Sequence, residues 1–216
     1  MIKIKYILDV INHIQDLRAV VFDLDDTLYS EKEYIRNGYR EIARILPDVP
    51  MVEDKLWDLF EQKKNAIDEL LKNENIYTLE LKQRCLHVYR NQKPLIHLYP
   101  GVREMLQKMH EDGLFLGMIT DGRPEGQRAK IIALGLDSLF DEIIITDELG
   151  GKECRKPSPL AYELIRKKFN RSLPAPLLKY SQMCYVGDNC RKDFIAPQKL
   201  GMRCIQFQNT DGLYAF

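Results

Sequence analysis

AVVFDLDDTLY, residues 19–29, joins a short apolar run directly to a group of acidic residues. The run from Ala19 to Phe22 is continuous in apolar side chains, which is typical of a strand covered on both faces of a parallel sheet. Acids follow it at positions 23, 25 and 26. In open α/β sheets, ligands bind beyond the carboxyl ends of the strands. The stretch therefore predicts a buried strand that ends at a functional site.

The chain after Gly101 alternates between helical and strand patterns. Strands that alternate with helical patterns of ten or more residues predict parallel βαβ units. We therefore expect an α/β core with a doubly wound, mostly parallel, Rossmann-like sheet. The helices are expected at residues 101–112, 124–134, 158–169 and 191–200, and the strands at 114–120, 142–146, 182–188 and 203–207.

Residues 31–95 show apolar residues at intervals of three and four, with no convincing strand. They predict an all-helical insertion, which divides the chain into a core of residues 1–29 and 99–216 and an inserted domain of residues 30–98. Residues 4–17 also place apolar residues at helical spacing, so a helix is expected within an N-terminal extension of residues 1–18. Alternation over residues 2–8 is a weaker indication of a strand.

Composition excludes several classes of function. The chain has 216 residues, of which 45% are hydrophobic, and 32 Lys and Arg balance 32 Asp and Glu. This balance gives no electrostatic reason to expect nucleic acid or an anionic membrane as a partner. No apolar run reaches membrane-spanning length, and no secretory signal is recognisable. Five scattered cysteines without a CxxC pair are read as reduced thiols, so a cytoplasmic protein is expected.

Polar residues end three of the expected strands. The first strand ends in Asp23 and Asp25, the strand at 114–120 in Thr120-Asp121-Gly122, and the strand at 182–188 in Asp188-Asn189. Any one acid could simply cap the following segment. Three converging carboxylates instead repel one another unless a cation is present, and Mg²⁺ prefers such oxygen ligands together with phosphate. Lys156, before the helix expected at 158, could add a positive charge for phosphate.

These residues carry a resemblance to a known family. FDLDDTL (22–28), ITDG (119–122), the KP of RKPSP (155–159) and GDNCRKD (187–193) resemble, in order, the four motifs of the haloacid dehalogenase (HAD) superfamily of phosphohydrolases. The match runs from about residue 19 to the C-terminus, and the helical insertion resembles the cap domain of one subgroup.

The resemblance implies a role for each motif residue. Asp23 would attack phosphorus to form an aspartyl-phosphate, and Asp25 would protonate the leaving oxygen and then activate water. Mg²⁺ would be held by the carboxylates of Asp23 and Asp188 and by the backbone carbonyl of Asp25. Thr120 and the backbone N–H groups of Asp121 and Gly122 would bind the phosphoryl oxygens, and Lys156 would offset the negative charge. Asn189 and Asp193 would support the metal and the lysine. Thr27 would brace the loop by hydrogen bonds. Arg123, directly after the second motif, could bind a substrate phosphate or carboxylate, or could equally be a surface charge beside the helix.

The substrate expected from the resemblance is a small phosphorylated metabolite, such as a sugar phosphate or a nucleoside monophosphate. An acid at position 25 favours a phosphatase or a phosphomutase over a dehalogenase. Thr27 argues against a mutase, in which glycine tends to stand there, and a non-catalytic binding module is the remaining alternative. In the insertion, most of the polar and aromatic candidates for substrate contact are expected to pack or to be solvated: Tyr29, Glu31, Tyr34, Arg36, Tyr39 and Arg40.

Overall fold

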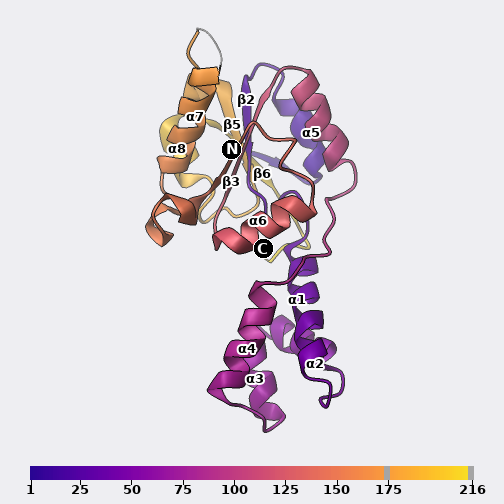
Figure 1. Cartoon of the computed structure of the whole chain (residues 1–216). Coiled ribbons are helices and arrows are strands. Elements are labelled where there is room, and N and C mark those ends of the chain that lie inside the picture. Colours follow the sequence, from indigo (N-terminus) through magenta and orange to yellow (C-terminus); the bar gives the residue numbers. More distant parts are fainter. Residues whose placement is uncertain (173–175, 214–216) are drawn as a thin grey trace. The chain divides into compact units, whose positions relative to one another are not determined.

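A computed structural model of the chain describes residues 1–172 and 176–213 (Figure 1). The chain divides into two compact units. The first comprises residues 1–31 and 96–216, and the second comprises residues 32–95. Residues 32–95, which separate the two parts of the first unit in the sequence, thus form a compact unit of their own.

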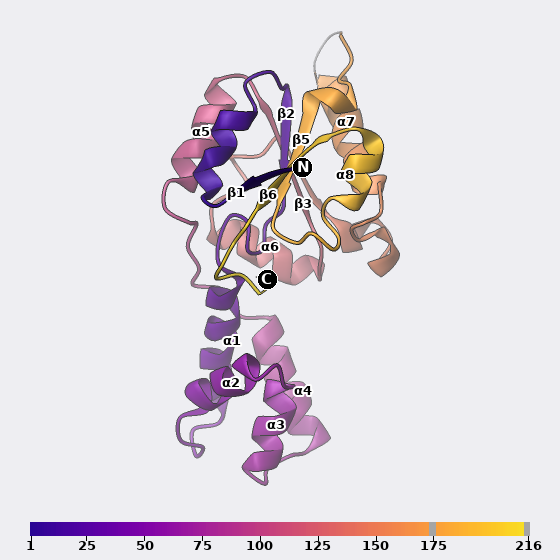
Figure 2. The same ribbon diagram turned by 180° about the vertical axis from the view of Figure 1, so that it is seen from behind.

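The first unit is built on one sheet of six parallel strands in the order β1-β6-β5-β2-β3-β4. Helices α7 and α8 lie on one side of the sheet, and α5 lies on the other (Figures 1 and 2). The expected Rossmann-like α/β fold is confirmed. The elements are β1 (Ile2–Ile4), β2 (Ala19–Phe22), α5 (Val102–Glu111), β3 (Phe115–Thr120), α6 (Pro124–Ala133), β4 (Glu142–Ile145), α7 (Leu160–Ser172), β5 (Met183–Gly187), α8 (Ile195–Leu200) and β6 (Arg203–Phe207).

The central strands are buried because their sequences are almost entirely apolar. Every residue of β2, β3 and β5 is buried. Apolar side chains of these strands, such as Val21 and Ile119, pack against Ile165 and Phe169 of α7 in one continuous core cluster. A strand covered on both faces has no room for alternating polar residues, which explains the runs AVVF and FLGMIT.

The helix expected over residues 4–17 is only partly confirmed, because a shorter helix of another type and a strand share the N-terminal segment. Residues 2–4 form strand β1, which pairs in parallel with β6 so that Ile2 lies beside Ile205. A 3₁₀ helix, η1 (Ile7–His13), follows. Val10 and Ile14 of this segment are buried. The misleading spacing of three arises because a 3₁₀ helix repeats every three residues, close to the α-helical period.

The second unit contains the all-helical arrangement that the sequence predicts. Its helices are α1 (Glu31–Ile45, whose first residue belongs to the first unit), α2 (Val52–Glu61), α3 (Ala66–Asn73) and α4 (Leu79–Arg90). The helical spacing of apolar residues within residues 31–95 does not mark the boundary between α2, which ends at Glu61, and α3, which begins at Ala66. Lys63, between them, has a positive φ of 58°, a conformation that interrupts a right-handed helix.

Most residues considered as substrate contacts on α1 are used within this helical unit. The rings of Tyr34 and Tyr39 pack against Tyr89 of α4, with centroids 6.1 Å and 5.9 Å away. The Arg36 guanidinium lies over the Trp57 ring, 4.5 Å from its centroid. Arg40 pairs with Glu53 at 3.3 Å. These contacts agree with the expectation that most of these residues pack or are solvated.

Gly38 allows α1 to approach α4 closely, and its replacement by alanine provides a test of this packing. A Cβ atom at position 38 would overlap the Tyr89 ring and the Gln92 amide. Alanine normally favours a helix over glycine by about 1 kcal/mol, whereas overpacking costs about 1–3 kcal/mol. We therefore expect Gly38→Ala to lower the thermal unfolding temperature. The same change should cost less in a Tyr89→Leu background, and an equal loss in both backgrounds would contradict the packing argument.

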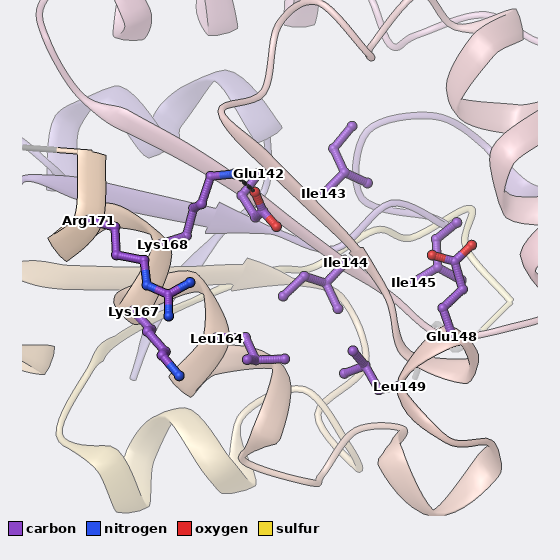
Figure 3. A pocket seen from close by; sticks show the side chains of 10 residues that line it. All are labelled: Glu142, Ile143, Ile144, Ile145, Glu148, Leu149, Leu164, Lys167, Lys168 and Arg171. Atoms are coloured by element: carbon purple, nitrogen blue, oxygen red, sulfur yellow. Dashed lines mark ion pairs between the residues drawn. The ribbon is translucent and has the colours of Figure 1, made fainter.

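Strand β4 is at one edge of the sheet, beside α7 (Figure 3). A hollow of about 380 Å³ lies there, floored by apolar side chains such as Ile144 and Leu164. Lys167, Lys168 and Arg171 of α7 line its side, and Lys168 pairs with Glu142 at 3.0 Å. Charged side chains beside an open strand edge disfavour edge-to-edge association.

Among the described residues, no helix has the length and apolar character needed to cross a membrane.

Candidate active site

Three adjacent strands deliver the polar motifs to the same edge of the sheet. Strand β2 lies between β5 and β3, and all three run in the same direction. Their carboxyl ends therefore bring Asp23, Thr120 and Asp188 to one side. A cavity of about 290 Å³ opens at this edge. It is lined by Asp23, Asp25, Glu31, Asp121, Arg155, Lys156, Asp188 and Lys192.

A buried lysine holds the proposed nucleophile. The Lys156 ammonium lies 2.6 Å from Asp23 Oδ1 and 2.9 Å from Asp193 Oδ1, and it donates a hydrogen bond of 2.9 Å to the Tyr185 hydroxyl. Burial raises the pKa of Asp23 to about 6, although the charge of Lys156 opposes this shift. Burial alone would lower the pKa of Lys156, but the two carboxylates hold it well above its ordinary value. The lysine therefore remains charged.

Buried carboxylates form a cluster suited to a divalent cation. Each of Asp23, Asp188 and Asp193 offers one carboxylate oxygen, and these oxygens lie within 4.8 Å of one another. Burial and the neighbouring Asp23 raise the pKa of Asp188 to about 8. A bound cation would relieve this unfavourable concentration of negative charge. Hard oxygen donors of this kind fit Mg²⁺.

The glycine before Asp188 gives the cluster its space. A Cβ atom on Gly187 would lie 2.6 Å from Asp193 Oδ2. The same Oδ2 accepts a hydrogen bond of 2.9 Å from the Asn189 backbone N–H. The Asn189 side chain in turn accepts one of 3.0 Å from the Arg191 N–H. The loop after β5 therefore fixes Asp193, a member of this cluster, against Lys156.

Asp25 is held by a separate set of donors. Its Oδ1 accepts a hydrogen bond of 2.5 Å from the Tyr29 hydroxyl and lies 2.7 Å from the Lys130 ammonium. Its Oδ2 accepts one of 2.9 Å from the Gln127 amide, which also donates to Thr120 Oγ1. Burial disfavours the ionised form, but the charge of Lys130 and the donated hydrogen bonds hold the pKa of Asp25 below its ordinary value.

The loop after β3 is tied to the lysine-bearing segment. Asp121 Oδ1 accepts hydrogen bonds of 3.1 Å from the Lys156 backbone N–H and 2.9 Å from the Thr146 hydroxyl. Its Oδ2 lies 3.1 Å from the Lys192 ammonium. Gly122 follows with a φ of 141°, which side chains rarely adopt. Asp121 thus links the second and third motifs through its side chain, a contact that the sequence did not predict.

One candidate residue lies away from the cavity, and one expected hydrogen bond is not formed. Arg123 does not line the cavity and pairs with Glu125 at 3.7 Å, with 53% of its side chain exposed. The Thr27 hydroxyl is buried and has no hydrogen-bond partner among the described residues, so the prediction that it braces the loop by hydrogen bonds is wrong. The loop is instead held through Asp26. Its Oδ1 and Oδ2 accept hydrogen bonds from the backbone N–H groups of Glu31 (2.9 Å) and Leu213 (2.7 Å).

Sequence reasoning missed the residues of α6 that contact Asp25. Gln127 and Lys130 are only 4% and 5% exposed, which is unusual for polar residues on a surface helix. They stand three apart and therefore share one helix face. The available signal was this pair of long polar residues in the helix directly after the second motif. Tyr185 and Lys192 were also missed.

The chain is similar to several known phosphatases and hydrolases. A glyceraldehyde 3-phosphate phosphatase of Methanocaldococcus jannaschii is 28% identical over 203 residues, which cover 86% of this chain and 82% of that protein. A phosphoglycolate phosphatase of Aliivibrio fischeri is 25% identical over 92% of this chain and 86% of its own length. A HAD hydrolase of Bacillus subtilis, solved bound to magnesium, shares the fold with a TM-score of 0.62 at 18% identity, over 88% of this chain and 86% of its own.

The family itself is defined by a match over most of the chain. The sequence model of the haloacid dehalogenase-like hydrolases matches residues 17–201, which include all four motifs. The expected resemblance is thereby confirmed, and the expectation of a phosphoric monoester hydrolase agrees with the phosphatases among the relatives. The chain belongs to the haloacid dehalogenase-like hydrolases.

Proposed function

We propose that the protein is a Mg²⁺-dependent phosphatase that acts through an aspartyl-phosphate. The observation that carries this proposal is the buried Asp23–Lys156 ion pair beside Asp188, at the edge of the cavity. A carboxylate held by a permanent cation is oriented for attack, and the same cation offsets the charge of an incoming phosphoryl group. Phosphoryl transfer needs mainly positioning and charge neutralisation, and this site supplies both.

The residues divide the reaction into two steps. Asp23 attacks phosphorus, and the bond to the leaving oxygen breaks as Asp25 gives that oxygen its proton. Asp25, now ionised, then accepts a proton from the water that attacks the phosphoryl group on Asp23. The phosphate dianion places negative charge near Asp25, which raises the pKa of that carboxyl from its low resting value. Free phosphate leaves, and Asp23 is restored.

The remaining motif residues bind charge. Asp23 and Asp188, with the backbone carbonyl of Asp25, would hold Mg²⁺. When bound, the ion would supply positive charge that offsets the negative charge of the phosphoryl oxygens. Thr120 and the backbone N–H groups of Asp121 and Gly122 would bind those oxygens.

The substrate is proposed to be a small phosphorylated metabolite, and glyceraldehyde 3-phosphate is the first candidate. The similarity to a phosphatase of that name spans 86% of this chain, and a triose phosphate is small enough for a cavity of about 290 Å³. We propose that residues 32–95 serve as the cap that controls access to the site. Glu31 lines the cavity and directly precedes residues 32–95 in the chain. Of the candidate contacts on α1, it is therefore the one best placed to contact substrate.

Phosphate release from a panel of esters tests the function. The panel holds glyceraldehyde 3-phosphate, phosphoglycolate, hexose phosphates and nucleoside monophosphates, each with Mg²⁺ and with EDTA. We expect turnover with Mg²⁺ and a loss of at least about 100-fold in EDTA, because a bound ion supplies several kcal/mol of charge stabilisation. Mg²⁺ should also raise the unfolding temperature, since it binds only the folded site. Folded protein that binds Mg²⁺ but releases no phosphate would contradict the proposal.

A further inference from the structure

We propose that Gln127 and Lys130 of α6 are positioning residues that act through Asp25, an inference that rests on the proposed phosphatase function. Neither residue lies in one of the four motifs, at residues 22–28, 119–122, 155–159 and 187–193. Both lie on the helix that follows the second motif, and both reach the carboxylate at the end of β2. Together with Tyr29 they form what we call the Asp25 clamp: Tyr29, Gln127 and Lys130.

The clamp fixes the orientation of the Asp25 carboxylate. Lys130 and Tyr29 both contact Oδ1, at 2.7 Å and 2.5 Å, whereas Gln127 contacts Oδ2 at 2.9 Å. Donors on both oxygens prevent rotation of the carboxylate about its Cβ–Cγ bond. Proton transfer in the transition state requires that an oxygen lie within hydrogen-bond reach of the reacting group. A fixed carboxylate meets this requirement without an ordering cost in each turnover.

Gln127 also couples the acid to the phosphate-binding loop. Its amide nitrogen donates both to Asp25 and to the Thr120 hydroxyl. One side chain therefore sets the spacing between the residue that handles protons and the residue proposed to bind phosphoryl oxygens. Burial of Gln127 keeps water from replacing either contact. Gln127 and Lys130 stand about one helical turn apart on α6. This one helix therefore contacts both oxygens of the Asp25 carboxylate and, through Gln127, the Thr120 hydroxyl.

An alternative explanation is that Lys130 and Gln127 only stabilise the fold. A buried ion pair contributes little net stability, because its desolvation offsets its attraction. Three donors on Asp25 also satisfy the lone pairs of a buried carboxylate, so the contacts themselves fit both explanations. The two explanations differ in their consequences for catalysis, since only positioning predicts an effect that depends on the leaving group and on the presence of Asp25.

The first test compares leaving groups in Lys130→Met and Gln127→Leu. Measured as kcat/KM, which reports the steps through the first phosphoryl transfer, the loss with the best alkyl phosphate of the panel should be roughly 100-fold. The loss with p-nitrophenyl phosphate should stay below roughly tenfold, because nitrophenolate leaves without needing a proton. Arg128→Met, on the same helix but exposed and paired with Glu148, is the matched control and should change neither value. Equal losses with both esters would overturn the proposal.

The second test is a double-mutant cycle with Asp25→Ala. If Lys130 acts through Asp25, adding Lys130→Met to Asp25→Ala should lower kcat/KM for p-nitrophenyl phosphate by less than roughly threefold, as expected for residues that act as a unit. For the alkyl ester, the single variants should lose comparable activity. Multiplied losses in the double variant would show a structural role and overturn the proposal. If the wild-type protein hydrolyses no ester, the proposed phosphatase function fails. If the wild type is active but the variants lose equal activity with both esters, only the positioning role fails.

Discussion

Asp23→Asn will remove at least about 10⁴-fold of the phosphatase activity, because the amide cannot act as the nucleophile. The asparagine would keep the size and position of the side chain at the end of β2. Lys156 also contacts Asp193, but that carboxylate is fixed by the Asn189 N–H and does not line the cavity, so it cannot replace the nucleophile. Turnover should be measured with saturating Mg²⁺, together with trapping of a covalent phosphoenzyme, which should be absent from the variant.

The same variant should be folded and at least as stable as the wild type in EDTA. The pKa of Asp23, about 6, lies above the ordinary value, so the fold disfavours the charge on this carboxyl when no cation is bound. A group with a raised folded-state pKa destabilises the protein at pH values above its unfolded pKa, when it must be ionised. Replacement by neutral asparagine removes that penalty at pH 7, and Lys156 keeps Asp193 as its partner at 2.9 Å, so no buried charge is left unpaired. Asp137→Asn, at an exposed position, is the control, and an active Asp23→Asn enzyme would contradict the nucleophile assignment.

Lys156→Met will lower both activity and stability. It leaves the Asp23 and Asp193 carboxylates without their shared cation, and both are almost fully buried. Removal of one partner from a buried ion pair costs about 3–5 kcal/mol. For a chain of this size, that cost corresponds to a fall of roughly 6–20 °C in the unfolding temperature. Thermal unfolding in EDTA measures this effect, and phosphate release measures the loss of charge compensation.

A second substitution separates the electrostatic cause from simple loss of packing. Asp23→Asn in the Lys156→Met background removes one of the two uncompensated charges and should recover part of the lost stability. Lys167→Met, on the exposed face of α7, should leave the unfolding temperature unchanged. An unaltered unfolding temperature in Lys156→Met, or no recovery in the double variant, would show that the ion pair is not the source of the effect.

The strands and the ends of the strands were predictable because buried parallel strands leave a direct trace in sequence. The run Ala19–Phe22 and the acids after it indicate both the strand and the edge at which it ends. The site residues share that edge for a topological reason, so their convergence follows from the order of the motifs. Contacts made by long side chains leave a weaker trace. The spacing of Gln127 and Lys130 marks one face of the helix, but residues 124–134 do not specify that this face points toward Asp25, because this depends on how α6 is rotated about its axis.

The N-terminal segment shows a different limit. A three-residue strand such as Ile2–Ile4 is too short to produce a distinct alternating pattern, and its pairing with residues 205–207 is decided by the other end of the chain. Likewise, the break between α2 and α3 depends on a left-handed conformation at Lys63, a residue type that does not favour it. Strand β1 is held by its pairing with β6, whereas α2 ends in a local turn in which the Lys64 N–H donates to the Leu59 carbonyl at 3.0 Å. Residue propensities alone indicate neither feature.

The two chain segments that lead into and out of residues 32–95 are joined to each other within the first unit. The Tyr99 N–H donates to the Leu28 carbonyl at 2.9 Å, and Tyr29 forms an antiparallel bridge with Leu98. This clasp fixes the distance between the two connection points whatever lies between them. Because loop-closure entropy grows only slowly with length, a longer, shorter or unrelated folded insert would disturb the sheet little. The insertion point is therefore a place at which the inserted unit should be exchangeable without redesign of the sheet.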